Sequence, residues 1–218
     1  MDLARDGYGL LQSGIESGLL ETVSGEAFAA RAAGTRCLLD SPSVEATAIA
    51  IKERLVSTGI LPSSAVAIQA IAFDKTPDIN WKVAWHQDLM FPFSEKVSAP
   101  GYELPSCKSG IHYARPPRDV LGELLAARLH LDDCGESNGP LRVSPGTHML
   151  GLIPSSDAAA RAAANGEVSC LAAVGDILLM RPLLLHASSQ ASSPGNRRVL
   201  HFVYHSGRTL PESWHRKI

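Results

Sequence analysis

The chain lacks the features that would place it in a membrane or on a nucleic acid. None of its 218 residues belong to a run of about 18 consecutive apolar residues, which a membrane-spanning helix needs. Its formal net charge of -2 provides no basic field for a polyanion. We therefore expect neither a membrane nor a nucleic acid as a partner.

Paired cysteines and a secretory signal are also missing. The four cysteines, at positions 37, 107, 134 and 170, form no Cys-x-x-Cys pair, which argues against a zinc knuckle and for reduced structural thiols. The first residues do not follow the basic-then-apolar order of a secretory signal. These absences predict a cytoplasmic protein.

Residues 1–62 are predicted to form a helical N-terminal layer. The segment at 25–33 is alanine-rich. Further on, apolar residues recur every three or four positions, as expected for one face of a helix. This stripe consists of Val44, Ala48, Ile51 and Leu55.

The remaining core, residues 63–205, is predicted to be mainly β. Short apolar runs between Gly, Pro and Asn turns predict strands at 65–73, 81–89, 124–131, 175–186 and 199–204. We find no internal repeat and no linker, so residues 1–218 are expected to form a single domain. Many short strands behind helices are typical of a jelly roll or a related barrel.

Three side chains form a complete ligand set for one metal ion. His86 and Asp88 are two residues apart in an apparent strand, so they are expected on one face, about 6.8 Å apart. His186 ends the apolar run, where a neutral imidazole needs a partner. Two histidines and a carboxylate with open positions suit non-haem Fe(II). His148 is expected to stabilise a turn instead, because the triad is already complete.

The segment at 92–118 is rich in residues that interrupt regular structure. It contains five prolines and two glycines, and it starts just after the expected metal-binding strand. Long irregular segments in compact domains are often lids or binding loops. We therefore predict a substrate lid, with substrate contacts among Tyr102, His112, Tyr113 and Arg115.

The order of these motifs resembles the phytanoyl-CoA dioxygenase family of Fe(II)/2-oxoglutarate-dependent oxygenases. The resemblance covers residues 65–205. It rests on Trp-His-Gln-Asp at 85–88, Asn-Gly-Pro-Leu-Arg-Val-Ser-Pro-Gly-Thr-His at 138–148, Gly-Asp-Ile-Leu-Leu at 175–179, then His186, Ser188 and Arg197. The resemblance implies a double-stranded β-helix core, cupin-like in architecture, in which His86, Asp88 and His186 hold iron.

The resemblance also implies how 2-oxoglutarate is anchored. Arg197 is expected to bind its distal carboxylate, because a guanidinium matches a carboxylate bidentately. Arg198 is the alternative, since neighbours on a strand face opposite ways, but the family's arginine usually lies eleven residues after the distal histidine. A hairpin is expected to return Arg197 beside the strand of His186. Ser188 is expected to add a hydroxyl to the same carboxylate, unless it is only a turn serine.

Other polar residues are candidates for the C1 carboxylate or for the pocket wall. For the C1 carboxylate of 2-oxoglutarate we expect Gln69, with Lys75 as second choice, because related enzymes use a polar residue in this region. Gln87, between the two ligands, is expected to point away from the metal. Arg128 and His130 share one strand face, which either lines the pocket or faces solvent.

By resemblance, the reaction consumes 2-oxoglutarate and O2 on Fe(II), releases succinate and CO2, and hydroxylates an unactivated C–H bond. Because Asp88 is present, a halogenase that gives this position to chloride is disfavoured. The short chain favours a small-molecule substrate, whose identity the fold does not determine.

Two other functions are compatible with the same residues. The first is a cupin-like metal enzyme that does not use 2-oxoglutarate, and Arg197 argues against it, because such chemistry needs no buried cationic fork. The second is a non-catalytic ligand-binding or sensing member of the fold, which the complete triad disfavours.

Overall fold

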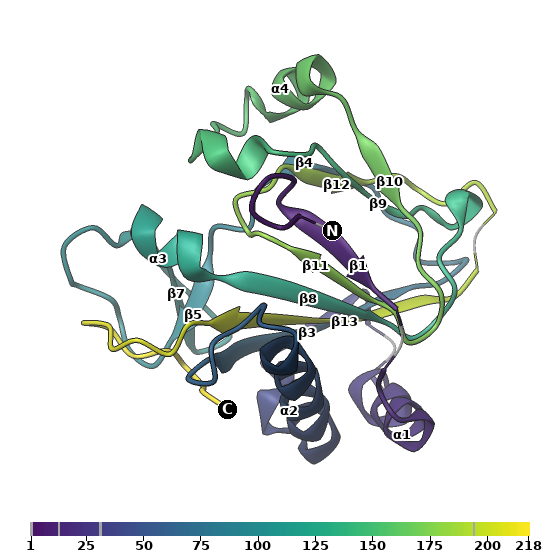
Figure 1. Cartoon of the computed structure of the whole chain (residues 1–218), viewed down its shortest axis with the longest axis horizontal. Coiled ribbons are helices and arrows are strands. Elements are labelled where there is room, and N and C mark those ends of the chain that lie inside the picture. The colour runs from purple at the N-terminus through teal and green to yellow at the C-terminus, as the bar shows by residue number, and fades with distance from the viewer. Residues whose placement is uncertain (1, 13, 31, 194) are drawn as a thin grey trace.

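The computed structural model is a sandwich of two antiparallel sheets (Figure 1), and it describes residues 2–12, 14–30, 32–193 and 195–218. The major sheet contains, in spatial order, β1 (Tyr8–Leu11), β11 (Ile177–Met180), β8 (Leu125–His130), β13 (Arg197–His205), β3 (Val66–Lys75) and β2 (Gly34–Arg36). The minor sheet contains β10 (Val168–Cys170), β9 (Leu141–Val143), β12 (His186–Ser188) and β4 (Val83–His86). The architecture is therefore mainly β, as predicted.

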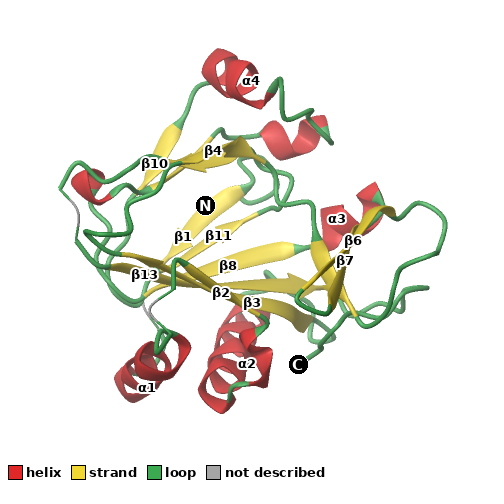
Figure 2. Ribbon diagram, turned by 180° about the vertical axis from the view of Figure 1, so that it is seen from behind, coloured by secondary structure: helices red, strands yellow, loops and turns green. Residues whose placement is uncertain are grey.

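Helices cover the sandwich from outside. They are α1 (Ser17–Ala27), α2 (Pro42–Ser57), α3 (Arg118–Glu123) and α4 (Ala158–Asn165), with short 3-10 turns at Leu38–Asp40, Glu136–Asn138 and Thr147–Leu150. Figure 2 shows α1 and α2 on one side of the major sheet and α4 beyond the minor sheet. None of the described helices combines the length and apolar character needed to cross a membrane.

The outer face of the major sheet packs against α2. This helix buries the predicted stripe of Val44, Ala48, Ile51 and Leu55. Strand β3 presents small residues to the same core, including Ala67, Ala70 and Ala72, so the helix can approach closely. The buried hydroxyl of Tyr204 on β13 donates a 2.8 Å hydrogen bond to the carbonyl of Ala48. The predicted second helix is therefore confirmed.

A second core lies between the two sheets. Its buried members include Ile68, Phe91, Leu141, Leu178 and Val203. The inward faces of β3, β8 and β13 also carry buried polar side chains, which an ordinary jelly-roll core would not need. These groups belong to the candidate site.

The N-terminal layer is not wholly helical, which corrects the prediction for residues 1–62. Strand β1 pairs with β11, and β2 pairs with β3, so both belong to the major sheet. The helix predicted at 25–33 ends at Ala27, and residue 31 lies outside the described residues. Alanine content alone misplaced it, because alanine has high helix propensity but does not mark where a helix ends.

The strand predicted at 175–186 is two strands in different sheets. β11 ends at Met180 in the major sheet, and β12 begins at His186 in the minor sheet. Pro182 lies between them and has no N–H for a strand ladder, and the Leu184 N–H donates to the Arg181 carbonyl in a turn. This crossover carries His186 to the sheet that also contains His86.

The segment at 92–118 is mostly regular, so the prediction of irregular structure is wrong. β5 (Phe91–Phe93), β7 (Ile111–Arg115) and β6 (Glu103–Lys108) form a third sheet with β7 in the centre. Pro92 and Pro105 lie on the edge strands β5 and β6, where a missing N–H is tolerated. Ser109 and Gly110 have φ of +50° and +78° and form the two-residue turn of a hairpin.

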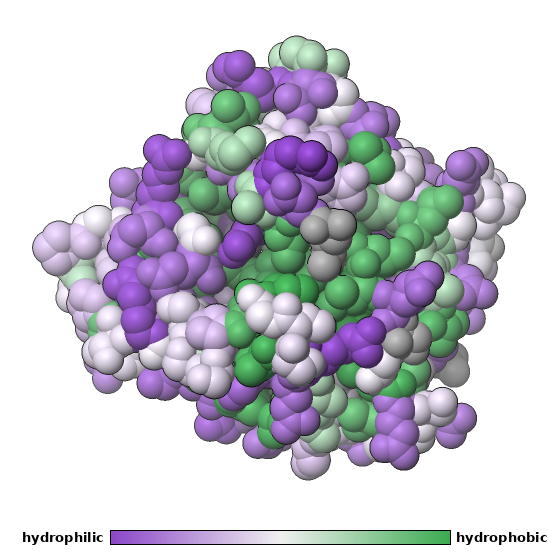
Figure 3. Space-filling view, in the orientation of Figure 1, coloured by the Kyte–Doolittle hydropathy of each residue, from purple (hydrophilic) through white to green (hydrophobic). Residues whose placement is uncertain are grey.

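One face of the molecule exposes apolar side chains. Figure 3 shows them gathered in the middle of the view, towards the region of β1 and β10. Leu10 of β1 and Val168 of β10 are among the exposed large hydrophobic residues. Neither lines the large cavity described below, so this face is distinct from the candidate site.

Candidate metal centre

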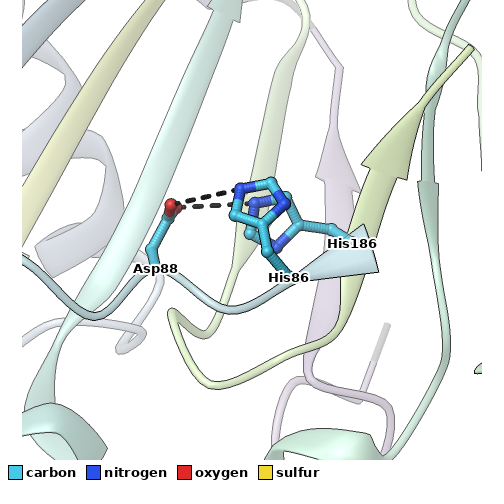
Figure 4. Close-up of side chains that lie close together, drawn as sticks. All are labelled: His86, Asp88 and His186. Atoms are coloured by element: carbon cyan, nitrogen blue, oxygen red, sulfur yellow. Dashed lines mark ion pairs between the residues drawn. The ribbon is translucent and has the colours of Figure 1, made fainter. Parts of the chain in front are cut away.

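His86, Asp88 and His186 converge as the sequence predicts (Figure 4). His86 Nε2 lies 3.7 Å from Asp88 Oδ1, and His186 Nε2 lies 3.7 Å from Asp88 Oδ2. Ligand atoms bonded to one ion at about 2.1 Å are separated by roughly 3.0 Å at right angles and by at most about 4.2 Å. Both separations from Asp88 fall in this range, and the three ligand atoms lie within 4.8 Å of one another, close enough to bind one divalent ion after small side-chain adjustments.

Backbone carbonyls orient both imidazoles. The Nδ1 of His86 lies 2.8 Å from the carbonyl of Ala84, and the Nδ1 of His186 lies 2.9 Å from that of Leu184. A carbonyl only accepts, so Nδ1 carries the proton and Nε2 keeps a lone pair. Burial lowers the pKa of His186 to about 4, which keeps this imidazole neutral at pH 7. A neutral imidazole fixed by a second partner is typical of a metal ligand.

Strand pairing brings the triad together. β12 pairs with β4 so that His186 lies directly opposite His86. The predicted strand at 81–89 is shorter than expected, because β4 ends at His86. Asp88 lies beyond the strand end, where its backbone N–H donates a 2.9 Å bond to the Pro182 carbonyl. The crossover between β11 and β12 thus positions both His186 and Asp88.

Gln87 points away from the triad and ties together the segments behind it. Its Nε2 donates to the carbonyls of Gly151 and Leu183 at 2.7 and 2.6 Å, and its Oε1 accepts from the Ile153 N–H at 2.9 Å. The side chain is buried. Gln87 therefore holds the metal-binding segment against two loops.

Replacing Gln87 with leucine is expected to destabilise the fold by on the order of 3 kcal/mol, because it leaves buried carbonyls and an N–H without partners. For a domain of this size that corresponds to a melting temperature lower by about 6–12 °C. Thermal unfolding followed by circular dichroism measures this change in melting temperature. Gln190→Leu removes one exposed bond, to the Asn80 carbonyl, and is expected to change stability by less than about 0.5 kcal/mol. Equal effects of the two substitutions would contradict this account.

The triad lies in the wall of a cavity of about 500 Å³, a size typical of small-molecule sites. The inward residues of β3 and β13 line the opposite wall, together with Arg128 of β8. Aromatic and aliphatic side chains form much of the remaining lining, including Phe73, Trp81 and Met90. The cavity therefore joins the metal ligands to the buried polar groups of the major sheet.

Arg197 faces the cavity and Arg198 faces away from it. Arg197 is 5% exposed and donates from Nη1 to the carbonyl of Gly139, while its buried Nε has no partner. Arg198 forms an ion pair with Asp132, with Nη2 to Oδ1 at 2.7 Å. The predicted hairpin beside β12 is wrong, because β13 pairs with β3 and β8 in the other sheet. Residue 194 of the predicted turn lies outside the described residues.

Lys75 lies beside Arg197. The two residues are register partners on β3 and β13. Lys75 is 3% exposed, and its Nζ donates to Ser188 Oγ at 3.3 Å and to the Ser189 carbonyl at 3.1 Å. Burial, and then the charge of Arg197, lower the pKa of Lys75 to about 8. Within the described chain no carboxylate pairs with Lys75 or Arg197. Arg197 and Ser188 line the cavity, and Lys75 contacts Ser188 without lining it.

A third buried cation lies nearer the triad. Arg128 is 8% exposed, lines the cavity and donates from Nη1 to His201 Nδ1 at 3.0 Å. Burial lowers the pKa of His201 to about 3, so this ring is a neutral acceptor. The possibility that Arg128 and His130 form a solvated face is wrong, since both are buried. His130 does not line the cavity, and burial lowers its pKa to about 3.

Gln69 also lines the cavity, and its buried Oε1 has no partner among the described residues. Of the four residues predicted for substrate contact, Tyr113 lines the cavity, whereas Tyr102, His112 and Arg115 do not. His148 is remote from the triad, and its Nε2 lies 3.0 Å from the carbonyl of Ala4.

Several lining residues were not predicted from the sequence, among them Arg36 of β2 and Leu104 and Lys108 of β6. Arg36 belongs to the layer predicted to be helical, and β6 to the segment predicted to be irregular. Because these strands were not predicted, no sequence pattern indicated that the three side chains face the cavity.

Residues 28–199 match the family model described as "Phytanoyl-CoA dioxygenase (PhyH)". This range contains the triad, Lys75, Ser188 and Arg197. No curated protein sequence matches the chain.

Several solved structures share its fold. EctD from S. alaskensis with 2-oxoglutarate and 5-hydroxyectoine matches 94% of this chain and 73% of its own, at 20% identity and a TM-score of 0.69. The non-heme alpha ketoglutarate dependent epimerase SnoN from nogalamycin biosynthesis matches 93% of this chain and 78% of its own, at 18% identity and a TM-score of 0.65. HygX from Streptomyces hygroscopicus with nickel and 2-oxoglutarate bound matches 93% of this chain and 84% of its own, at 15% identity and a TM-score of 0.63. These likenesses confirm the double-stranded β-helix fold.

Proposed function

The chain belongs to the phytanoyl-CoA dioxygenase family of Fe(II)/2-oxoglutarate-dependent oxygenases, and from this premise we propose that it hydroxylates a small molecule, with release of succinate and CO2. One oxygen atom of O2 enters the C–H bond of the substrate and the other enters succinate, while C1 of 2-oxoglutarate leaves as CO2. The C–H bond and 2-oxoglutarate each supply two electrons. The bound iron supplies the redox chemistry.

The observation that carries this proposal is a cavity that contains both the triad and the buried Arg197, with the buried Lys75 beside Arg197 and no carboxylate paired with either cation among the described residues. His86, Asp88 and His186 offer a neutral and anionic ligand set that suits Fe(II) and leaves positions open. Lys75 and Arg197 are costly to bury without a counter-charge. A dicarboxylate reaching from the metal to these cations would satisfy both groups.

Lys75, Ser188 and Arg197 are proposed to bind the distal carboxylate of 2-oxoglutarate. Arg197 offers its fork, and Ser188 Oγ and Lys75 Nζ lie 3.3 Å apart beside it. This position moves Lys75 away from the C1 role that the sequence suggested as second choice, because Lys75 is the register partner of Arg197. The distal end would then carry two positive charges.

Arg128 is proposed for the C1 carboxylate, ahead of Gln69. His201, its hydrogen-bond partner, is four residues beyond Arg197 on β13 and is paired with Arg128 across the strands. The buried Arg128 Nε has no partner, so a donor remains for an anion near the metal. Gln69 lies two residues before Ile71, the register partner of His201, and it is proposed to contact substrate instead.

The hairpin of β6 and β7 is proposed to cover the cavity mouth. Leu104, Lys108 and Tyr113 from this hairpin line the cavity. A cover over the mouth would exclude water during the reaction. We propose that the lid predicted for 92–118 is this ordered sheet rather than a loop.

Affinity for 2-oxoglutarate is expected to fall as the pH rises through about 8, because free Lys75 loses its proton there. Arg197, Arg128 and Cys134 also face Lys75. The pKa of Arg128 is about 10, while burial lowers the pKa of Arg197 and raises the pKa of the Cys134 thiol from their usual values. Calorimetric titration between pH 6.5 and 9 measures the effect. Lys75→Met should weaken binding by about tenfold below pH 8 and flatten the profile.

The matched control is Lys82→Met, which removes an exposed cation outside the cavity. It should keep the wild-type pH profile. A profile that is flat in the wild type, or unchanged in Lys75→Met, would show that Lys75 does not bind the cosubstrate.

Succinate formation tests the proposed function against its two rivals. A cupin-like enzyme that does not use 2-oxoglutarate would form no succinate, and a non-catalytic binding member would form at most one equivalent per protein. The proposed dioxygenase should form many equivalents, dependent on Fe(II), 2-oxoglutarate and O2. Substrate-free turnover is expected to be slow but catalytic.

A further inference from the structure

The charges around the cavity do not balance. Among the described residues that line it, Arg36, Lys108, Arg128 and Arg197 are cationic, whereas Asp88 is the only carboxylate. A divalent metal and the dianion of 2-oxoglutarate cancel each other, so they leave this excess unchanged. Arg128 and Arg197 are buried and have proposed roles, whereas Arg36 and Lys108 are exposed and have none.

Arg36 and Lys108 lie on connected parts of the rim. Arg36 ends β2, and the next residue, Cys37, has its Sγ 3.7 Å from the hydroxyl of Tyr113 on β7. Lys108 ends β6 and pairs with Ile111 of β7 across the hairpin turn. The contact between Cys37 and Tyr113 therefore joins the strand that carries Arg36 to the hairpin that carries Lys108.

Neither rim cation is neutralised by a neighbouring carboxylate. Glu103 of β6 pairs with Arg115, and Asp40, close to Arg36 in sequence, pairs with Arg216. In the part of the chain that the structure describes, no ion pair involves Arg36 or Lys108. Two unpaired cations at the mouth of a partly apolar cavity concentrate field lines and attract an anion.

The backbone is strained at Leu104, an apolar residue of the rim. Leu104 lines the cavity, is 60% exposed and has a φ of +53°, in the left-handed region that leucine rarely adopts. It lies at an irregularity in the pairing of β6 with β7. Such backbone strain is unfavourable and is found mostly at ligand and active sites. Here it presents an apolar side chain to the cavity, with Phe73 and Trp81 also in the lining.

We propose that the substrate is an amphipathic anion, whose carboxylate or phosphate binds between Arg36 and Lys108 and whose apolar part extends past Leu104 towards the triad. This inference rests on the proposed function and names its substrate class. The hydroxylated C–H bond belongs to the apolar part, because the anionic group is held at the rim. The rim cations would repel a cationic substrate and add little affinity for a neutral one.

A set of probes with one chain length tests the charge requirement. Octanoate, octyl phosphate, octanamide and octylamine are titrated into the protein loaded with Fe(II) and saturating 2-oxoglutarate under anaerobic conditions, so that the cosubstrate blocks the deep cations. Ligand-observed NMR measures the dissociation constants. We expect one or both anions to bind at least about tenfold more tightly than octanamide, and octylamine to bind most weakly. The octanoate and octyl phosphate arms distinguish a carboxylate from a phosphate group.

The double variant Arg36→Gln/Lys108→Gln should lose this preference for anions, whereas octanamide binding should change little. The matched control Arg161→Gln removes an exposed cation of α4, outside the cavity, and should keep the preference. The inference is overturned if no anion binds more tightly than octanamide, or if the double variant keeps the preference. Failure of the proposed function would be distinct, because the wild-type protein would then not bind 2-oxoglutarate in the loading step.

Discussion

Substituting His86 or Asp88 with alanine is expected to reduce Fe(II) affinity by more than about 100-fold and to remove measurable turnover. Loss of a group that only orients a metal ligand typically costs 10–100-fold, and these residues are proposed as ligands themselves. The fold should survive, because Asp88 is 32% exposed and both side chains lie at a cavity wall rather than in a packed core. Anaerobic calorimetry with Fe(II) measures the affinity, and circular dichroism checks the fold.

The matched control for the triad is His112→Ala. His112 lies on β7 and does not line the cavity, so iron affinity should stay at the wild-type value. Near-normal iron binding in both His86→Ala and Asp88→Ala would contradict the assignment. An equal loss in His112→Ala would show that the effect comes from damage to the fold.

Substituting Arg197 with alanine is expected to weaken 2-oxoglutarate binding by at least about 30-fold. Truncating one partner of a buried charge pair costs about 2–5 kcal/mol, and Arg197 is 5% exposed. Lys75 and Ser188 would remain, so some affinity should survive. The measurement is the concentration of 2-oxoglutarate that gives half-maximal succinate formation, together with direct titration.

Arg198→Ala is the control for this prediction, because it removes the neighbouring guanidinium. Arg198 forms its ion pair with Asp132 on the side away from the cavity. We therefore expect 2-oxoglutarate affinity to change by less than about threefold, with some loss of stability. The opposite ranking of the two variants would move the anchor to Arg198 and contradict the proposed site.

The convergence of the three candidate metal ligands could be predicted from the sequence because they follow local rules. His86 and Asp88 are two residues apart, and His186 follows an apolar run, so each ligand could be found without knowing the topology. Strand alternation also predicted correctly that only one of Arg197 and Arg198 faces inward. The amphipathic stripe of α2 was found for the same reason, since its period is local.

What the sequence did not predict depends on contacts between distant segments. The register of β13 against β3 places Lys75 beside Arg197, and no pattern within either strand contains that information. The crossover at Pro182 was hidden inside one continuous apolar run. Prolines in 92–118 favoured an irregular lid, because their tolerance on edge strands becomes apparent only when the sheet is known.

An anaerobic crystal structure of the protein with Fe(II) and 2-oxoglutarate tests the central claim most directly. Anomalous scattering at the iron edge should give one peak at about 2.0–2.2 Å from His86 Nε2, His186 Nε2 and an Asp88 carboxylate oxygen. The distal carboxylate of 2-oxoglutarate should lie within hydrogen-bonding distance of Arg197, Ser188 and Lys75. An iron peak outside the triad, or a 2-oxoglutarate molecule that contacts none of these three residues, would contradict the account.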